Sequence, residues 1–81
     1  MTEKKYYVNP MYDVESLIEL NDFEVVVVDR VENGYNTPSL VMDSINLELR
    51  KNGMLEKTSD EILEVLLYLE KINILGTNEN I

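Results

Sequence analysis

Residues 58–72 read Thr-Ser-Asp-Glu-Ile-Leu-Glu-Val-Leu-Leu-Tyr-Leu-Glu-Lys-Ile, and they carry the clearest helix signal in this 81-residue chain. Thr58 and Glu61 have the spacing of a capping box, in which each side chain bonds the backbone of the other residue. Asp60 and Glu61 also place negative charge in the first turn, at the positive end of the helix dipole. The pattern predicts a helix that runs from Thr58 to about Ile72.

The apolar residues of this helix cover far more than one stripe, which is typical of a helix that is buried on most sides or shared with another subunit. A chain of this length is close to the lower limit for a self-sufficient core, and a second subunit would supply additional buried surface. We therefore expect a homodimer. Its predicted interface consists of four residues on this helix: Ile62, Val65, Leu66 and Leu69.

The segment before this helix has two possible structures. Thr37-Pro38 is a good helix start, and Gly53 suits the left-handed position that closes a helix, so a helix over residues 38–52 is favoured. The alternative is an alternating strand, Ile45–Arg50, that turns at Asn52-Gly53 into a second strand.

The residues Phe23–Val31 contain four consecutive valines between polar turn residues, which predicts a strand buried on both faces. Lys5–Asn9 is expected to form a second strand, and Tyr12–Leu20 a short amphipathic helix. The predicted fold is therefore α+β: a small β-sheet centred on residues 23–31, packed against a C-terminal αα-hairpin. Residues 1–81 should form a single domain with frayed ends at 1–5 and 76–81.

The composition argues against catalysis and metal binding. The chain has no Cys and no His, so it lacks the residues that most often serve as nucleophiles, general bases and metal ligands. Its three glycines stand alone, and none belongs to a phosphate-binding loop. The paired acids at residues 13 and 15, and at 60 and 61, read as first-turn helix residues. We expect no enzymatic activity, no cofactor and no metal.

The charge balance limits the partners. With 16 acidic and 7 basic residues the net charge is −9, which disfavours direct binding to nucleic acid or to an anionic membrane. The N-terminal residues show no apolar signal core, and no apolar run is long enough to span a bilayer, so a cytoplasmic location is expected.

The acidic residues are not evenly distributed. Between Tyr6 and Asp29 there is no Lys or Arg. A surface of one sign attracts a cationic partner, although a solvated acidic surface without a partner explains the same pattern. The candidate partner-binding residues are the six acids of this segment: Asp13, Glu15, Glu19, Asp22, Glu24 and Asp29.

These observations favour an acidic binding protein that inhibits or regulates a basic, nucleic-acid-binding protein by DNA mimicry, as small acidic proteins of phages and mobile elements do. Sixteen carboxylates match the charge of about 27 Å of duplex DNA. One alternative is a helix-turn-helix or winged-helix-like transcriptional regulator, but the last helix offers few basic residues for a groove. Another is a structural or assembly subunit with an apolar interface.

Overall fold

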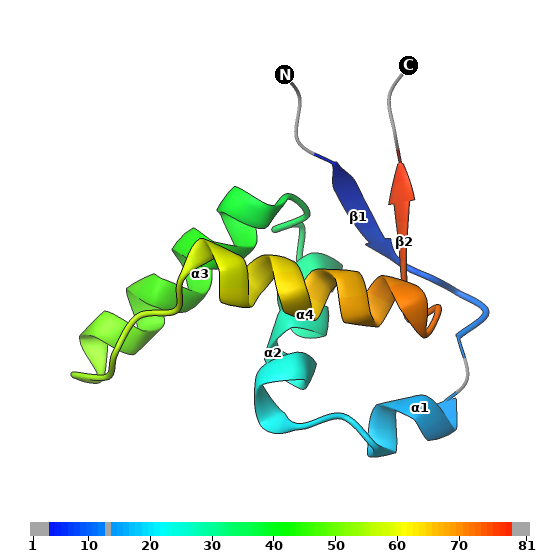
Figure 1. The fold of residues 1–81 in the computed structure, drawn as a ribbon, viewed down its shortest axis with the longest axis horizontal. Helices are drawn as coiled ribbons and strands as arrows, with labels where there is room; N and C mark the ends of the chain where they lie inside the picture. The colour runs from blue at the N-terminus through cyan, green and yellow to red at the C-terminus, as the bar shows by residue number, and fades with distance from the viewer. Residues whose placement is uncertain (1–3, 13, 79–81) are drawn as a thin grey trace.

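The computed structural model describes residues 4–12 and 14–78, and these form an α+β fold with a two-stranded antiparallel sheet (Figure 1). The order of elements along the chain is β1 (Lys5–Val8), α1 (Val14–Ile18), α2 (Asp22–Glu32), α3 (Pro38–Lys51), α4 (Ser59–Lys71) and β2 (Leu75–Asn78). The α+β class, the N-terminal strand and the short helix after it are confirmed.

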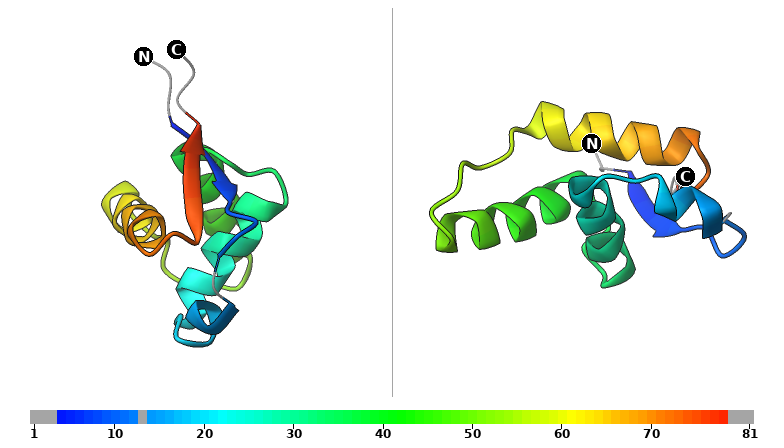
Figure 2. Two further views of the ribbon diagram at one scale, coloured as in Figure 1. Left: turned by 90° about the vertical axis from the view of Figure 1, so that its right-hand side faces the viewer. Right: turned by 90° about the horizontal axis from the view of Figure 1, so that it is seen from below.

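The C-terminal αα-hairpin is also confirmed, because residues 38–51 form helix α3 and not a β-hairpin. The side chain of Thr37 accepts a hydrogen bond from the backbone N–H of Leu40, and Pro38 occupies the first turn. Helix α4 begins with the predicted capping box between Thr58 and Glu61. A loop joins the end of α3 to the start of α4, and the two helices are inclined to each other (Figure 1 and Figure 2).

The prediction of a strand at residues 23–31 is wrong, because this segment lies within helix α2. Asn21 and Glu24 form a second capping box at its start, a helix signal that the strand prediction did not take into account. The valine run suits a helix because Val27, Val28 and Val31 share one side and are buried in the core. Valine costs only a few tenths of a kcal/mol in a helix, whereas burying its side chain stabilises by about 1.5 kcal/mol or more.

Helices α2, α3 and α4 end in the same way. In each, the residue after the cap has a positive φ: Gly34 at 99°, Gly53 at 68° and Asn73 at 65°. In each, the next residue donates a backbone hydrogen bond to the carbonyl oxygen of the residue five positions earlier, at 2.9, 2.9 and 3.0 Å. These are Schellman motifs, which satisfy carbonyl groups that a helix end leaves free.

The expectation of a frayed tail from residue 76 is corrected, because residues 75–78 form strand β2. Strand β2 pairs with β1 so that Tyr7 lies opposite Gly76 and Val8 opposite Leu75. The expectation of fraying at Lys5 is likewise corrected, since Lys5 is part of β1, whereas residues 1–3 and 79–81 lie outside the described residues. The sheet therefore brings the two ends of the described chain side by side (Figure 1).

The core lies where α2, α3, α4 and the sheet meet. Its fully buried members come from several elements: Val27, Val41, Ile62, Leu66, Leu69, Ile74 and Leu75. Tyr6 from β1 is 4 % exposed and closes the core on the side of the sheet.

Candidate functional site

The structure spreads the five described acids of the predicted partner-binding segment over α1, the residue after it, and both ends of α2. Asp13 lies outside the described residues. Glu15 lies in α1 and Glu19 directly follows it, and both are exposed. Asp22 and Glu24 lie in the first turn of α2, whereas Asp29 lies near its other end.

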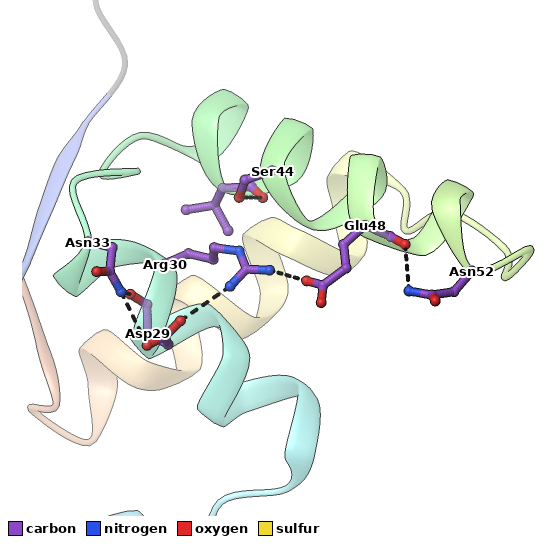
Figure 3. Close-up of polar contacts among 7 residues, drawn as sticks. Asp29, Arg30, Asn33, Ser44, Glu48 and Asn52 are labelled. Carbon is purple, nitrogen blue, oxygen red and sulfur yellow. Dashed lines mark hydrogen bonds and ion pairs between the residues drawn. The ribbon is translucent and has the colours of Figure 1, made fainter.

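Asp29 belongs to a polar network that joins α2 to α3 (Figure 3). Its carboxylate accepts hydrogen bonds from Arg30 Nη1 and from Asn33 Nδ2, each at 3.2 Å. The guanidinium of Arg30 also pairs with the carboxylate of Glu48 on α3. Asp29 is thus partly neutralised within its own chain, which makes it a weaker candidate for partner binding.

Glu24, in contrast, borders a groove between the N-terminal half of α2 and helix α4. The groove has a volume of about 360 Å³ and is lined by Phe23, Glu24, Glu61, Glu64, Val65 and Tyr68. Its lining contains three carboxylates and two aromatic rings, but no Lys or Arg. We call it the acidic groove.

The two capping boxes hold two of these carboxylates in place. Glu24 Oε1 accepts a hydrogen bond from the backbone N–H of Asn21 at 2.9 Å, and Glu61 Oε1 accepts one from Thr58 at 3.0 Å. Each cap uses Oε1, so Oε2 of Glu24 can contact another group, whereas Oε2 of Glu61 already lies 3.9 Å from Lys57 Nζ. Because each cap fixes its Glu side chain, a cation that binds here has less side-chain entropy to overcome.

Hydrogen bonding changes the acidity of Glu61. Its hydrogen bond from the backbone of Thr58 lowers the pKa, and the Thr58 hydroxyl and the charge of Lys57 act in the same direction. Glu61 therefore stays ionised at pH values where an ordinary glutamate begins to take up a proton.

A cation of the protein itself lies beside the groove. Lys57 Nζ lies 4.8 Å from the centre of the Phe23 ring and 3.9 Å from Glu61 Oε2. The backbone of Lys57 is fixed by Asn46, which accepts a hydrogen bond from Lys57 N at 2.7 Å and donates one to Lys57 O at 2.9 Å. An ammonium group thus already contacts one face of Phe23 and one carboxylate.

Of the residues in this groove, only Glu24 was predicted to bind a partner, whereas Val65 was assigned to a dimer interface and Glu61 to helix capping. The missed signal is Asn21 followed by Glu24, which has the same capping-box spacing as Thr58 and Glu61. Read as a helix start, it would have placed Glu24 in the first turn of a helix, as Glu61 is in α4.

The residues predicted for a dimer interface are corrected. Ile62, Leu66 and Leu69 are at most 1 % exposed in a single chain, so they are core residues and cannot reach another molecule. Val65 is only partly buried and lines the acidic groove. The exposed apolar residues of α4 are instead Leu63, Leu67 and Tyr68.

Within residues 4–12 and 14–78, no group of three or more acidic side chains has an arrangement that could hold a metal ion. None of the helices in the same part of the chain combines the length and apolar character needed to cross a membrane.

Comparison of the chain with protein families, with curated proteins and with solved structures finds no match. Any functional assignment therefore depends on the physical chemistry of the surface.

Proposed function

We propose that this protein is a non-enzymatic binding protein that recognises basic side chains of a partner protein in the acidic groove. The observation that carries the proposal is the lining of that groove. Two helices contribute three carboxylates around Phe23 and Tyr68, and the lining contains no base.

This combination of groups suits arginine and lysine. A carboxylate pairs with a guanidinium or ammonium group, and an aromatic face attracts the same cation by about 0.5–2 kcal/mol. Lys57 supports this view, because its ammonium group makes both contacts at the edge of the groove. A partner side chain would make the same types of contact with Glu24, Glu64 and Tyr68.

The finer proposal is that the partner is a nucleic-acid-binding protein and that this chain inhibits it by DNA mimicry. The net charge of −9 supports a partner whose natural ligand is a polyanion. The longest dimension of the described chain is 36 Å. This exceeds the roughly 27 Å of duplex DNA whose phosphates equal the 16 carboxylates of the chain in number.

A regulator that reads DNA with α4 is less well supported. Residues of a recognition helix need to donate hydrogen bonds to phosphates and base edges. The exposed positions of α4 include Asp60, Glu61 and Glu64, which would repel the phosphate backbone.

Titration with an arginine-rich peptide tests the proposal. We expect binding that weakens steeply with salt, since exposed charges are screened over about 8–10 Å at physiological ionic strength. Replacing Glu24, Glu61 and Glu64 with Gln should lower the affinity strongly. Gln keeps the side-chain oxygen that both capping boxes need, so the variant should stay folded.

The matched control changes the net charge equally but leaves the acidic groove intact: Glu32→Gln, Asp43→Asn and Glu56→Gln. If the two triple variants lose affinity for the peptide to the same extent relative to the parent, only net charge matters and the acidic groove is not the binding site. For the finer proposal, a captured partner should be released by duplex DNA at constant ionic strength. If duplex DNA does not release the partner at constant ionic strength, DNA mimicry is excluded; release by added salt is expected for any charge-based contact and does not decide between the two.

A further inference from the structure

Helix α4 has a second exposed face, which the acidic groove does not use. Asp60, Leu63, Leu67 and Lys71 are spaced by three, four and four residues, so they lie within an arc of about 80° on the helix. All four are exposed, and the side chains of Leu63 and Leu67 remain 41 % and 55 % accessible. We call these four residues the α4 stripe.

The stripe borders an apolar groove on the side of α4 that faces β1 and α3. This groove has a volume of about 380 Å³ and is lined by Lys4, Tyr6, Pro38, Ser39, Met42, Ser59, Ile62, Leu63 and Leu67. Three other grooves on the described residues, including the acidic groove, are each lined by at least one carboxylate. This one has none, and its single charged residue is Lys4.

The order of residues in the stripe makes it complementary to itself. When two copies of α4 pack antiparallel about a two-fold axis, a residue that precedes the axis by a given number of positions in one copy faces the residue that follows it by the same number in the other copy. The midpoint between Asp60 and Lys71 falls within one residue of the midpoint between Leu63 and Leu67. One axis therefore sets each Leu63 against the Leu67 of the other copy and each Asp60 beside the other copy's Lys71.

We propose that the α4 stripe and the adjoining apolar groove bind a second copy of the chain. The two α4 helices pack antiparallel, and the two-fold axis crosses them at the level of residue 65 along the helix. Charge is the main reason to choose a second copy. Two molecules of net charge −9 repel each other, so they can associate only where carboxylates are few or are paired with cations. The apolar groove meets the first condition, and the paired ends of the α4 stripe meet the second.

The proposal does not depend on the acidic groove, and the two can be distinguished by salt. Added salt screens the repulsion between the two copies, so it should strengthen the dimer. The same change should weaken the binding of a basic partner. Dimerisation and partner binding can therefore fail or succeed separately.

Sedimentation equilibrium of the full chain over a concentration series tests the proposal. We expect a reversible association from 9.4 kDa to twice that mass. Leu67→Glu should abolish it, because a charge would be placed in an apolar contact, whereas Leu55→Glu should have no effect, since Leu55 is 92 % exposed in the α3–α4 loop. Far-ultraviolet circular dichroism of both variants checks that they are folded. A parent chain that stays monomeric at all concentrations and salt levels would overturn the proposal.

Charge reversal tests the antiparallel arrangement. Asp60→Lys and Lys71→Glu should each weaken the dimer by about three- to tenfold, since each removes two exposed ion pairs and introduces repulsion. The double variant restores opposite charges across the axis and should recover most of the loss. A dimer that forms but shows no recovery in the double variant would contradict the proposed axis.

Discussion

The side chain of Asn46 bonds both backbone groups of Lys57, with Nδ2 2.9 Å from the carbonyl oxygen and Oδ1 2.7 Å from the amide nitrogen. Asn46 is only 7 % exposed, and it is the one polar residue in the buried part of the described chain. It joins the middle of α3 to the residue before the cap of α4. The same contact fixes the backbone from which Lys57 reaches Phe23 and Glu61.

Replacing Asn46 with Leu should destabilise the protein by about 2–4 kcal/mol, because both hydrogen bonds are lost and the backbone groups of Lys57 lose their partners. Asp keeps the acceptor for Lys57 N but sets a carboxylate oxygen against the Lys57 carbonyl oxygen, so it should also destabilise the protein at neutral pH. Urea unfolding measures both changes. Equal stability of Asn46→Leu and the parent would mean that the loop finds other partners.

Leu66→Ala should destabilise by about 2–5 kcal/mol, since Leu66 is fully buried in the core of a single chain. Leu55→Ala is the matched control and should change the free energy of unfolding by less than about 0.5 kcal/mol, because Leu55 is almost fully exposed. Thermal or urea unfolding of both variants makes the comparison. Similar losses at the two positions would contradict the observed burial.

Gly76→Ala should have a small cost that depends on Tyr7. An added Cβ at Gly76 would lie 2.4 Å from Tyr7 Cζ, which is closer than atoms can approach. Tyr7 is 45 % exposed, so its ring can move away, and the cost should be about 1 kcal/mol or less. In a Tyr7→Ala background the same substitution should cost less. A double-mutant cycle by urea unfolding measures the difference, and purely additive effects would exclude this contact.

The lowered pKa of Glu61 should be visible in a carbon-13 NMR titration of its carboxyl group, with a midpoint below the ordinary 4.5. Because the folded-state pKa is depressed, the associated stability is present above the unfolded pKa and is lost as the pH falls through the folded one. Thr58→Ala removes the hydroxyl but keeps the backbone hydrogen-bond donor. It should therefore raise the pKa only partly toward its ordinary value.

The pKa of the Tyr6 phenol is raised above 10.0 by burial and, secondarily, by the nearby charge of Glu70. A group with a raised folded-state pKa stabilises the protein below the unfolded pKa, and this contribution is lost as the pH rises through the folded one. We therefore expect stability to fall above about pH 10, with a smaller fall in Tyr6→Phe. Urea unfolding at alkaline pH tests this, and an identical decline in both proteins would exclude Tyr6 as the cause.

The local elements at the C-terminal end could be predicted because their signals lie within a few residues of one another. Thr37-Pro38 begins α3, Gly53 closes it, and Thr58 with Glu61 begins α4. Capping and turn formation depend on contacts between near neighbours, and the sequence contains those neighbours. The net charge and the lack of Cys and His are likewise properties of the sequence alone.

Tertiary structure decided what those local signals left open. The valine run is compatible with a strand or a helix, and α2 forms because it buries Val27, Val28 and Val31 against the other helices. Strand β2 exists only because β1, from the opposite end of the chain, supplies its hydrogen-bonding partner. The acidic groove also needs the fold, since Glu24 approaches Glu61 and Glu64 only when α2 packs against α4. Contacts between distant residues depend on which surfaces are buried together, and the local sequence pattern does not specify that.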